Sequence, residues 1–256
     1  MISAVLFDLD GTLVETEELK ALSHARSVTE LRPDVAEADV IAAYADDLVG
    51  HSRQEVATAL IQRFGLEAAA RKRMSEFGEE EPWRVLVRIR QGIYEAFLND
   101  SDLLLEKRYP HNIELLKELR CEGYPMACAT MSHRPQVERV LSVLGLEDAF
   151  DVVATMEDVK RGKPDPEIDL LVARKMGVPP EEFLVIEDSP AGVGAAVAAG
   201  MAVVAVPTRL TGKRLRASGL LEPRWVVEDP RTLPDVVRRR IEAAGGRRER
   251  NTRPRP

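Results

Sequence analysis

The sequence predicts an α/β protein in which helices cover both faces of a parallel β-sheet, with an all-helical domain inserted into it. From about residue 109 onward, helical and strand-like patterns alternate without hairpin turns, and this order is typical of parallel sheets. From residue 16 to about residue 100 the pattern is helical and shows no convincing strand. An apolar run of strand length, Ala4–Phe7, precedes the helical block. We therefore expect the first strand to belong to the later α/β part.

Length and composition agree with a soluble globular protein. The chain has 256 residues, of which 45% are hydrophobic and 31% charged, enough for one large domain or two of ordinary size. A net charge of -7 without a long basic block argues against a nucleic-acid partner. The longest apolar run, 191–206, is broken by three glycines, so it does not indicate a membrane span.

The start of the chain and its two cysteines indicate a cytoplasmic location. Asp8 and Asp10 interrupt the apolar N-terminal segment, which does not fit a signal peptide. Cys121 and Cys128 form no CxxC pair, and Cys128 lies within an apolar strand-like run. We expect Cys128 to be a reduced thiol in the core.

The helical block is expected to contain four helices, at 17–31, 36–48, 52–64 and 83–98. Pro33 should end the first helix, since the residue before a proline resists the helical conformation. Ser52 and Glu55 have the spacing of a capping box. Pro82 should begin the fourth helix. The charged segment 67–81 fits either a helix or a loop.

The α/β part is expected to contain strands at 125–129, 151–154, 183–186, 201–206 and 225–227, and helices at 112–122, 136–144, 166–176, 191–199, 213–217 and 232–244. The segment 245–256 is rich in Arg, Gly and Pro and should be disordered. The predicted domains are a core of residues 1–14 and 109–244 and an inserted helical domain of residues 15–108. Because the inserted domain follows the Asp8/Asp10 loop directly, it is positioned to act as a lid.

Two aspartates directly follow the first strand. Side chains at positions i and i+2 of an extended chain point the same way, so Asp8 and Asp10 should project together. Gly11 lets the backbone turn there and approach a ligand. Two carboxylates this close favour a bound cation, and Mg²⁺ prefers oxygen ligands. An Asx-type turn is the alternative interpretation, and this stretch alone does not decide between them.

Three further strand ends carry polar residues, at the edge where ligands bind in such sheets. Thr130, Met131 and Ser132 follow the strand at 125–129; they suit a phosphate oxygen or cap the next helix. Lys163 lies between a glycine and a proline and is either an anion ligand or an exposed loop lysine. Glu187 and Asp188 follow the strand at 183–186; they would complete a cation site or cap a helix.

Together these loops resemble the haloacid dehalogenase superfamily, specifically its phosphatases with a helical cap after the first motif. Phe7-Asp8-Leu9-Asp10-Gly11-Thr12-Leu13 resembles the first motif and Ala129-Thr130 the second. Lys163-Pro164-Asp165-Pro166 resembles the third, and Val185-Ile186-Glu187-Asp188-Ser189 the fourth. The resemblance covers about residues 1–244 and implies a Rossmann-like core with an inserted helical cap.

The resemblance also implies residue roles. Asp8 would be the nucleophile that forms an aspartyl-phosphate, and Asp10 the general acid and base. Thr130 and Lys163 would hold the phosphoryl oxygens. Mg²⁺ would be held by Asp8, the backbone carbonyl of Asp10 and Asp188, with Glu187 nearby or acting through water. The residues expected to contact the substrate are Gly11, Thr12, Thr16, Arg53, Met131 and Ser132.

The inserted domain should determine the substrate. Gly50-His51-Ser52-Arg53 resembles the Gly-x-Ser-Arg loop of beta-phosphoglucomutase-like members, in which the Arg contacts the distal phosphate of a sugar phosphate. An exposed arginine at the start of a helix is the alternative for Arg53. Lys20 stands where the mutases have a histidine, whereas Thr16 keeps a polar residue at the hinge. That departure favours a phosphatase over a mutase.

The sequence therefore predicts a Mg²⁺-dependent phosphatase that acts on a small phosphorylated metabolite, such as a sugar phosphate. A beta-phosphoglucomutase-like mutase and a non-catalytic scaffold that binds a phosphorylated ligand are the alternatives. The expected protein is a cytoplasmic monomer without nucleic-acid or membrane partners.

Overall fold

The structure is a computed structural model that describes residues 1–48 and 52–251. The chain forms two compact units. Unit 1 comprises Met1–Glu15 and Leu104–Pro256, and unit 2 comprises Thr16–Leu103. The sequence analysis places the first boundary between residues 14 and 15 and the second between residues 108 and 109. In the structure they lie between residues 15 and 16 and between residues 103 and 104.

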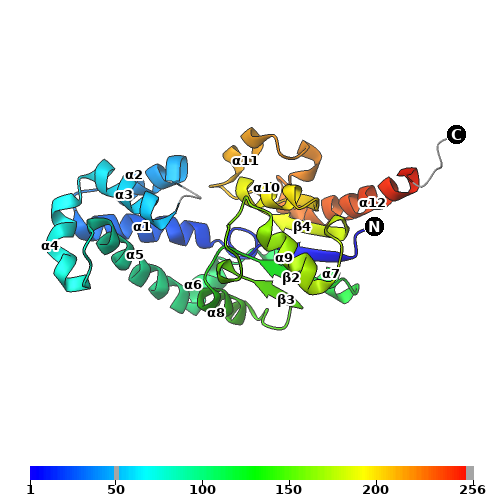
Figure 1. The fold of residues 1–256 in the computed structure, drawn as a ribbon, viewed down its shortest axis with the longest axis horizontal. Coiled ribbons are helices and arrows are strands. Elements are labelled where there is room, and N and C mark those ends of the chain that lie inside the picture. The colour runs from blue at the N-terminus through cyan, green and yellow to red at the C-terminus, as the bar shows by residue number, and fades with distance from the viewer. Residues whose placement is uncertain (49–51, 252–256) are drawn as a thin grey trace. The chain divides into compact units, whose positions relative to one another are not determined.

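Unit 1 contains a five-stranded sheet in which every neighbouring pair is parallel (Figure 1). Its strands are β1 (Ala4–Phe7), β2 (Met126–Ala129), β3 (Val152–Ala154), β4 (Phe183–Glu187) and β5 (Ala202–Ala205). The strand order is β3-β2-β1-β4-β5. In the register, Leu6 of β1 lies opposite Ala127 of β2 and Val185 of β4. The first strand is therefore central, with strands from later in the chain on both sides.

Helices lie between the strands of unit 1 and after the last of them (Figure 1). They are α7 (Pro110–Cys121), α8 (Arg134–Leu144), α9 (Glu167–Met176), α10 (Pro190–Ala198), α11 (Gly212–Ser218) and α12 (Leu233–Asn251), and α6 (Ser101–Glu106) spans the junction with unit 2. Short 3-10 turns are Met156–Asp158, Pro180–Glu182, Pro223–Trp225 and Pro230–Thr232. Gly145 and Gly177 end α8 and α9 in the left-handed conformation, with φ of 64° and 67°, as expected for helix C-termini.

The strands of unit 1 are apolar because the sheet is covered on both faces. Every residue of β1, β2, β4 and β5 is buried. On one face, Leu6 and Val185 belong to a core cluster with Ile168 and Val172 of α9 and Val193 of α10. The loops at the strand ends are thereby anchored to a rigid base.

Two sequence predictions in unit 1 are wrong. Residues 225–227 form no strand, because Pro223 begins a 3-10 turn and only Val226 bridges to Ala205; proline fixes φ and lacks an N–H for a ladder. Helix α12 continues to Asn251, into the segment expected to be disordered. Residues 247–250, Arg-Arg-Glu-Arg, favour a helix, and the next proline is Pro254. Residues 252–256 lie outside the described residues.

All the regular secondary structure in the described residues of unit 2, 16–48 and 52–103, is helical. Its helices are α1 (Thr16–Leu31), α2 (Glu37–Ala43), α3 (Arg53–Phe64), α4 (Glu67–Phe77) and α5 (Pro82–Asn99), with a π-helical turn at Tyr44–Leu48. Helix α5 packs against α1, α3 and α4, and Leu60, Leu66 and Leu86 are buried in the shared core. The charged segment 67–81, which the sequence left open, is helical up to Phe77.

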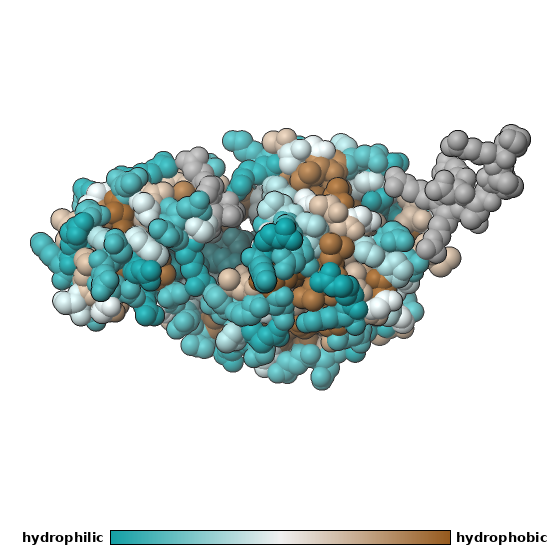
Figure 2. Space-filling view, in the orientation of Figure 1, coloured by the Kyte–Doolittle hydropathy of each residue, from teal (hydrophilic) through white to brown (hydrophobic). Residues whose placement is uncertain are grey.

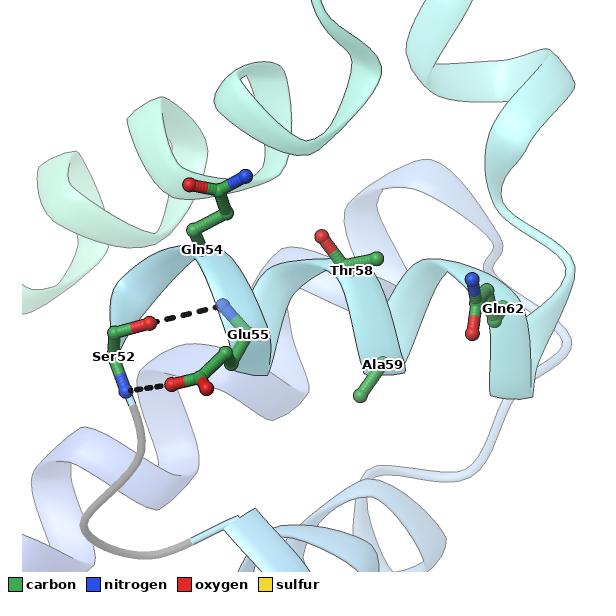
Figure 3. A pocket seen from close by; sticks show the side chains of 6 residues that line it. All are labelled: Ser52, Gln54, Glu55, Thr58, Ala59 and Gln62. Carbon is green, nitrogen blue, oxygen red and sulfur yellow. Dashed lines mark hydrogen bonds between the residues drawn. The ribbon is translucent and has the colours of Figure 1, made fainter.

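The start of α3 has the capping box that the sequence predicts. Ser52 Oγ accepts a hydrogen bond from the Glu55 backbone N–H at 3.3 Å, and Glu55 Oε2 accepts one from the Ser52 N–H at 2.8 Å (Figure 3). The two bonds satisfy backbone donors that a helix start leaves unpaired. The preceding Gly50 and His51 of the predicted cap loop lie outside the described residues.

The two chain segments that connect unit 1 to unit 2 pair with each other. Val14 and Arg108 form an antiparallel bridge. The Glu15 N–H donates to the Lys107 carbonyl at 2.8 Å, and the Tyr109 N–H donates to the Leu13 carbonyl at 2.9 Å. The outgoing and returning segments thus form a short two-stranded ribbon on unit 1.

The surface is mostly hydrophilic on the face shown in Figure 2, with apolar residues in smaller groups. Among the described residues, no helix has the length and apolar character needed to cross a membrane.

Candidate active site

Asp8 and Asp10 lie just beyond the C-terminal end of β1. The Asp8 N–H donates to the Ile186 carbonyl of β4 at 3.0 Å, which continues the ladder by one residue. Gly11 then turns the chain with φ of +80°, and its N–H donates to the Val14 carbonyl at 2.8 Å. A φ in this range favours glycine. The first carboxylate is thus fixed by the sheet and the second by a tight turn.

A single ammonium group joins three strand ends. Lys163 Nζ donates to Asp8 Oδ1 at 2.8 Å, to Glu187 Oε1 at 2.9 Å and to the Ala129 carbonyl at 3.0 Å. All three donors of the ammonium are therefore used. The side chains of Lys163, Asp8 and Glu187 are at most 8% exposed. The alternative of an exposed loop lysine is wrong.

For Lys163 and Asp8, burial and the charge of the partner shift the pKa in opposite directions. Burial by itself would lower the pKa of Lys163, but the Asp8 and Glu187 carboxylates raise it well above its usual value. Burial also raises the pKa of Asp8 well above its usual value, and Glu187 and Asp10 add to this against the opposing effect of Lys163. Lys163 therefore stays protonated, and it is one cation beside the three buried carboxyl groups of Asp8, Glu187 and Asp188.

Asp10 is held by two hydroxyl groups from the loop after β2. Thr130 Oγ1 and Ser132 Oγ donate to Asp10 Oδ2 at 3.0 Å and 2.5 Å. Thr130 Oγ1 also accepts from the Ser132 N–H at 3.1 Å. The sequence assigns Thr130 and Ser132 to phosphate or substrate binding; in this structure they orient Asp10.

A group of three buried carboxylates has the chemistry of a site for a hard cation. Asp8, Glu187 and Asp188 each offer an oxygen, and these oxygens lie within 4.8 Å of one another. A Cβ at Gly11 would lie only 2.5 Å from Asp188 Oδ2, so glycine keeps space open beside this carboxylate. Three carboxyl groups that converge on one point are the oxygen donors that Mg²⁺ prefers.

Glu187 is the least available of the three carboxylates. Its Oε1 accepts from Lys163, and its Oε2 accepts from the N–H and the hydroxyl of Ser189 at 2.7 and 3.1 Å. These bonds favour an indirect role for Glu187, as the sequence analysis expects. The carboxylate of Asp10 does not belong to the group of three.

The remaining predicted contact residues differ in their surroundings. Thr12 is fully buried, and its carbonyl accepts a hydrogen bond from Asn112 Nδ2 at 2.6 Å, so it ties the loop to α7. Met131 lies over Gly162, where a Cβ would be 2.8 Å from the methionine Cε. Thr16 and Arg53 belong to unit 2, and their substrate contacts stay predictions.

The sequence analysis did not single out Asp169 of α9. Asp169 is 1% exposed, and its Oδ2 has no hydrogen-bond partner among the described residues. Burial raises its pKa to about 6, with Lys163 opposing the rise and Glu187 adding to it. The spacing in the sequence could have revealed it. Asp169 lies three and four positions before the apolar Val172 and Ala173, so it shares with them the helix face that packs against the sheet.

A separate hollow of about 590 Å³ runs along α3 in unit 2 (Figure 3). It is lined by Ser52, Gln54, Glu55, Thr58, Ala59 and Gln62. None of these is a predicted catalytic residue, and the lining carries one carboxylate but no cationic group. The hollow has no constellation suited to phosphate chemistry.

Known proteins with similar sequences include phosphatases. The model of the family described as "Haloacid dehalogenase-like hydrolase" matches residues 5–206. Hexitol phosphatase A of Escherichia coli K12 is 33% identical over 84% of this chain and 88% of its own length. The bifunctional riboflavin kinase/FMN phosphatase of Arabidopsis thaliana is 31% identical over 80% of this chain, which spans only 48% of that longer enzyme.

A solved structure supports the same relationship. The beta-phosphoglucomutase of Clostridium difficile superposes with a TM-score of 0.67 and 25% identity, over 95% of this chain and 98% of its own. The family match covers all four motifs on which the site is built and every strand residue except Ala4. The chain therefore belongs to the haloacid dehalogenase-like hydrolases, in the branch that contains phosphatases and beta-phosphoglucomutases.

Proposed function

We propose that this protein is a Mg²⁺-dependent phosphatase that hydrolyses a small phosphorylated metabolite, such as a sugar phosphate, through an aspartyl-phosphate intermediate. The observation that carries the proposal is the pairing of two differently held aspartates. Asp8 is buried against Lys163 at 2.8 Å, and Asp10 is held by the Thr130 and Ser132 hydroxyls. A nucleophile and a proton carrier need such different surroundings.

In the first step, an Asp8 carboxylate oxygen attacks phosphorus. The bond between phosphorus and the ester oxygen breaks, and Asp10 gives its proton to the departing alcohol. In the second step, Asp10 accepts a proton from a water molecule that attacks the phosphorus of the aspartyl-phosphate. Inorganic phosphate leaves and Asp8 is regenerated. Asp10 must therefore alternate between its protonated and ionised forms.

Lys163 would neutralise charge on the phosphoryl oxygens while it keeps Asp8 in place. Its link to Glu187 at 2.9 Å supports this role, because the two side chains fix each other. Asp8 and Asp188 would hold Mg²⁺, with Glu187 acting indirectly. When bound, Mg²⁺ supplies positive charge that favours the ionised form of Asp8 and offsets the charge of the phosphoryl group.

Unit 2 serves as the cap in this proposal and supplies substrate specificity. Its connection to the site supports this, since the chain enters unit 2 at Thr16, six positions after Asp10. The protein acts as a cytoplasmic monomer.

The decisive experiment measures phosphate release from a panel of sugar phosphates and other small phosphate esters, with Mg²⁺ and with EDTA. We expect release that depends on Mg²⁺, with one class of ester preferred. Asp8→Asn should abolish turnover and leave the circular dichroism spectrum unchanged. Appreciable phosphatase activity in a folded Asp8→Asn variant would rule out Asp8 as the nucleophile.

The structural match to a beta-phosphoglucomutase keeps a sugar-phosphate mutase as the second candidate. A mutase would need priming by a sugar bisphosphate and would accumulate an isomeric sugar phosphate instead of inorganic phosphate. The same panel, followed by NMR of the sugar products, separates the two activities. Lys20 at the position where mutases carry a histidine favours the phosphatase.

A further inference from the structure

Asn112 is a buried polar residue in the first turn of α7. It is 5% exposed and lies three, four and seven positions before Leu115, Leu116 and Leu119, which are also buried. Residues at this spacing lie on one face of a helix, so Asn112 occupies the first position of an apolar stripe. A buried amide is unfavourable unless it is hydrogen-bonded. Its hydrogen-bond partner therefore indicates what this asparagine does.

The partner of Asn112 lies in the loop that carries the two aspartates after β1. Asn112 Nδ2 donates to the Thr12 carbonyl at 2.6 Å, and the two residues are 100 positions apart in the sequence. Thr12 is fully buried, so water does not replace this donor if the amide is removed. A buried carbonyl without a partner is costly, and rotation of the peptide group between Thr12 and Leu13 toward another donor would relieve the cost. The amide therefore fixes the orientation of this peptide group.

Asp8 and Asp10 depend on that orientation to different extents. The N–H of Asp8 donates to a carbonyl of β4 at 3.0 Å, so the sheet holds this residue. Asp10 instead enters a turn that is closed by the bond from the Gly11 N–H to the Val14 carbonyl, at 2.8 Å. Thr12 lies inside this turn. A rotated Thr12 peptide group would therefore displace Asp10 while Asp8 keeps its place on the sheet.

Asp10 tolerates little displacement, because two hydroxyl groups from another loop hold its carboxylate. Thr130 Oγ1 and Ser132 Oγ donate to the same oxygen, Asp10 Oδ2, at 3.0 and 2.5 Å. Both bonds require the turn after β1 and the loop after β2 to keep their relative position. Any group that fixes the turn therefore also fixes the Asp10 carboxyl.

We propose that Asn112 is a positioning residue for the general acid, and that its amide holds the turn at Thr12 so that the Asp10 carboxyl faces the leaving oxygen of the ester. This inference rests on the proposed function, in which Asp10 protonates the departing alcohol. The effect of Asn112 should therefore depend on how strongly the leaving group needs a proton. An alkoxide needs one as it departs, whereas p-nitrophenolate departs as the anion.

The test compares Asn112→Leu with the control Thr211→Val in two kinds of phosphate ester. Thr211 is 2% exposed, and its Oγ1 accepts a hydrogen bond from the Thr208 N–H at 2.9 Å in the loop after β5. Each substitution thus removes a buried bond between a side chain and a loop that follows a strand of the same sheet. We expect Asn112→Leu to lower kcat/KM for glucose 6-phosphate and glycerol 3-phosphate by about 10- to 100-fold. For p-nitrophenyl phosphate the expected loss is below about 3-fold, and Thr211→Val should leave the ratio of kcat/KM between the esters unchanged.

The comparison of esters separates positioning from support of the fold. The value of kcat/KM reports the steps up to formation of the aspartyl-phosphate, in which Asp10 is the acid. An equal loss with all three esters would show that Asn112 only supports the fold, and would overturn the proposal. The absence of any loss would overturn it as well. The proposed function would survive either result.

Asn112→Asp tests the donor itself, since an ionised carboxylate only accepts hydrogen bonds and a protonated carboxyl donates one. We expect its activity toward glucose 6-phosphate, as a fraction of the wild-type activity at the same pH, to rise as the pH falls from about 8 to about 5.5, because burial favours the protonated carboxyl. In Asn112→Leu this fraction should not change with pH. A constant low fraction in Asn112→Asp would contradict the role of the donor.

Amide hydrogen exchange, followed by NMR of ¹⁵N-labelled protein, tests the turn without any substrate. The N–H groups of Gly11 and Leu13 are both bonded within the loop at 2.8 Å. In Asn112→Leu we expect both to exchange about 10-fold faster or more, whereas the Val5 N–H of β1 keeps its protection. Unchanged exchange in the turn would overturn the proposal.

The exchange measurement also separates this inference from the proposed function. Faster exchange in a protein that hydrolyses no ester would show that Asn112 holds the turn, and would refute the proposed function alone. Asn112→Asp at pH 8, which scarcely changes the side-chain volume, replaces Asn112→Leu in every comparison if the latter does not fold.

Discussion

At the scale of single residues, Lys163 decides whether three buried carboxylates are tolerated. Its ammonium is shared between Asp8 and Glu187, and Asp188 lies in the same acidic group. Removing one partner of a buried ion pair leaves an uncompensated charge, which is far more costly than losing an exposed pair. The stability of unit 1 therefore depends on this one side chain.

We predict that Lys163→Met lowers the free energy of unfolding by about 3–5 kcal/mol at pH 7 in EDTA. The loss should be smaller at pH 5, because burial raises the pKa of Asp8 and a protonated Asp8 needs no countercharge. Urea unfolding at the two pH values measures this. Lys175→Met is the control, since Lys175 forms a half-exposed pair with Asp158 at 3.6 Å and should change stability by less than about 1 kcal/mol. Equal effects of the two substitutions would contradict the argument.

Asp169 gives a second prediction at this scale, in the pH dependence of stability. The folded protein keeps the Asp169 proton up to about pH 6, whereas the ordinary pKa is 3.8. Folding takes up a proton between these values, so the wild type loses stability as the pH rises from about 4 to 6. An asparagine at this position would stay neutral and avoid this loss.

In EDTA, we therefore expect Asp169→Asn to be more stable than the wild type by about 3 kcal/mol at pH 7.5, which corresponds to a shift of about two pKa units. The difference should vanish near pH 4. Thermal unfolding across this pH range is the measurement. A difference that does not change with pH would show that packing, and not the proton, is responsible.

At the scale of elements, the first turn of α10 is shaped around Glu187. A Cβ at Gly192 would lie 1.5 Å from Glu187 Oε1, whereas a Cβ at Gly194 would meet its nearest neighbour, Pro164 Cβ, at 3.4 Å. Both glycines lie within the same helix. Substituting each glycine in turn therefore distinguishes the space that Glu187 needs from the general effect of glycine on helix stability.

We predict that Gly194→Ala is neutral or stabilises the protein by up to about 1 kcal/mol, since alanine favours helix over glycine. Gly192→Ala should displace Glu187 from Lys163, lower stability by about 2 kcal/mol or more and reduce phosphate release strongly. Thermal unfolding and the phosphatase assay on both variants check this. Full activity in Gly192→Ala would mean that the contact between Glu187 and Lys163 is dispensable.

At the scale of the whole molecule, cation binding and folding should be linked. The acidic group draws its ligands from the ends of β1 and β4, which are far apart in sequence, so the site exists only in the folded chain. Mg²⁺ at about 100 times its dissociation constant should stabilise the protein by about 2.7 kcal/mol.

The melting temperature should therefore rise with Mg²⁺ and not with Na⁺ at equal ionic strength. Asp188→Asn should abolish the rise while it leaves the fold intact. Calorimetry with and without Mg²⁺ provides the measurement. A rise of the same size in Asp188→Asn would place the cation elsewhere.

Much of the fold could be predicted because each element of unit 1 carries local signals. Apolar runs marked the five strands, and glycines at Gly145 and Gly177 marked helix ends. The same signals failed where the local pattern is ambiguous. The run at 225–227 is apolar, but Pro223 prevents a strand, and the charges of 67–77 gave no periodicity from which α4 could be recognised.

The candidate site was partly predictable for a similar reason. Asp8 and Asp188 directly follow β1 and β4, and Lys163 lies in the loop between β3 and α9. Parallel strands bring the loops at their carboxyl ends together. The hydroxyl contacts to Asp10 depend on how the loop after β2 folds, which no local pattern specifies. Asp169 was missed because a charged residue within an apolar helical face is informative only once the face is known to be buried.

The ribbon formed by Val14 and Arg108 also bears on how such a protein can change over evolutionary time. Because the two connecting segments are already paired on unit 1, the ends of any inserted module are held close together, whatever the module contains. Residues between them can be replaced, shortened or exchanged for a different helical unit without breaking a strand of the sheet. A lineage could thus acquire new substrate preferences by swapping this module while the phosphate chemistry is inherited unchanged.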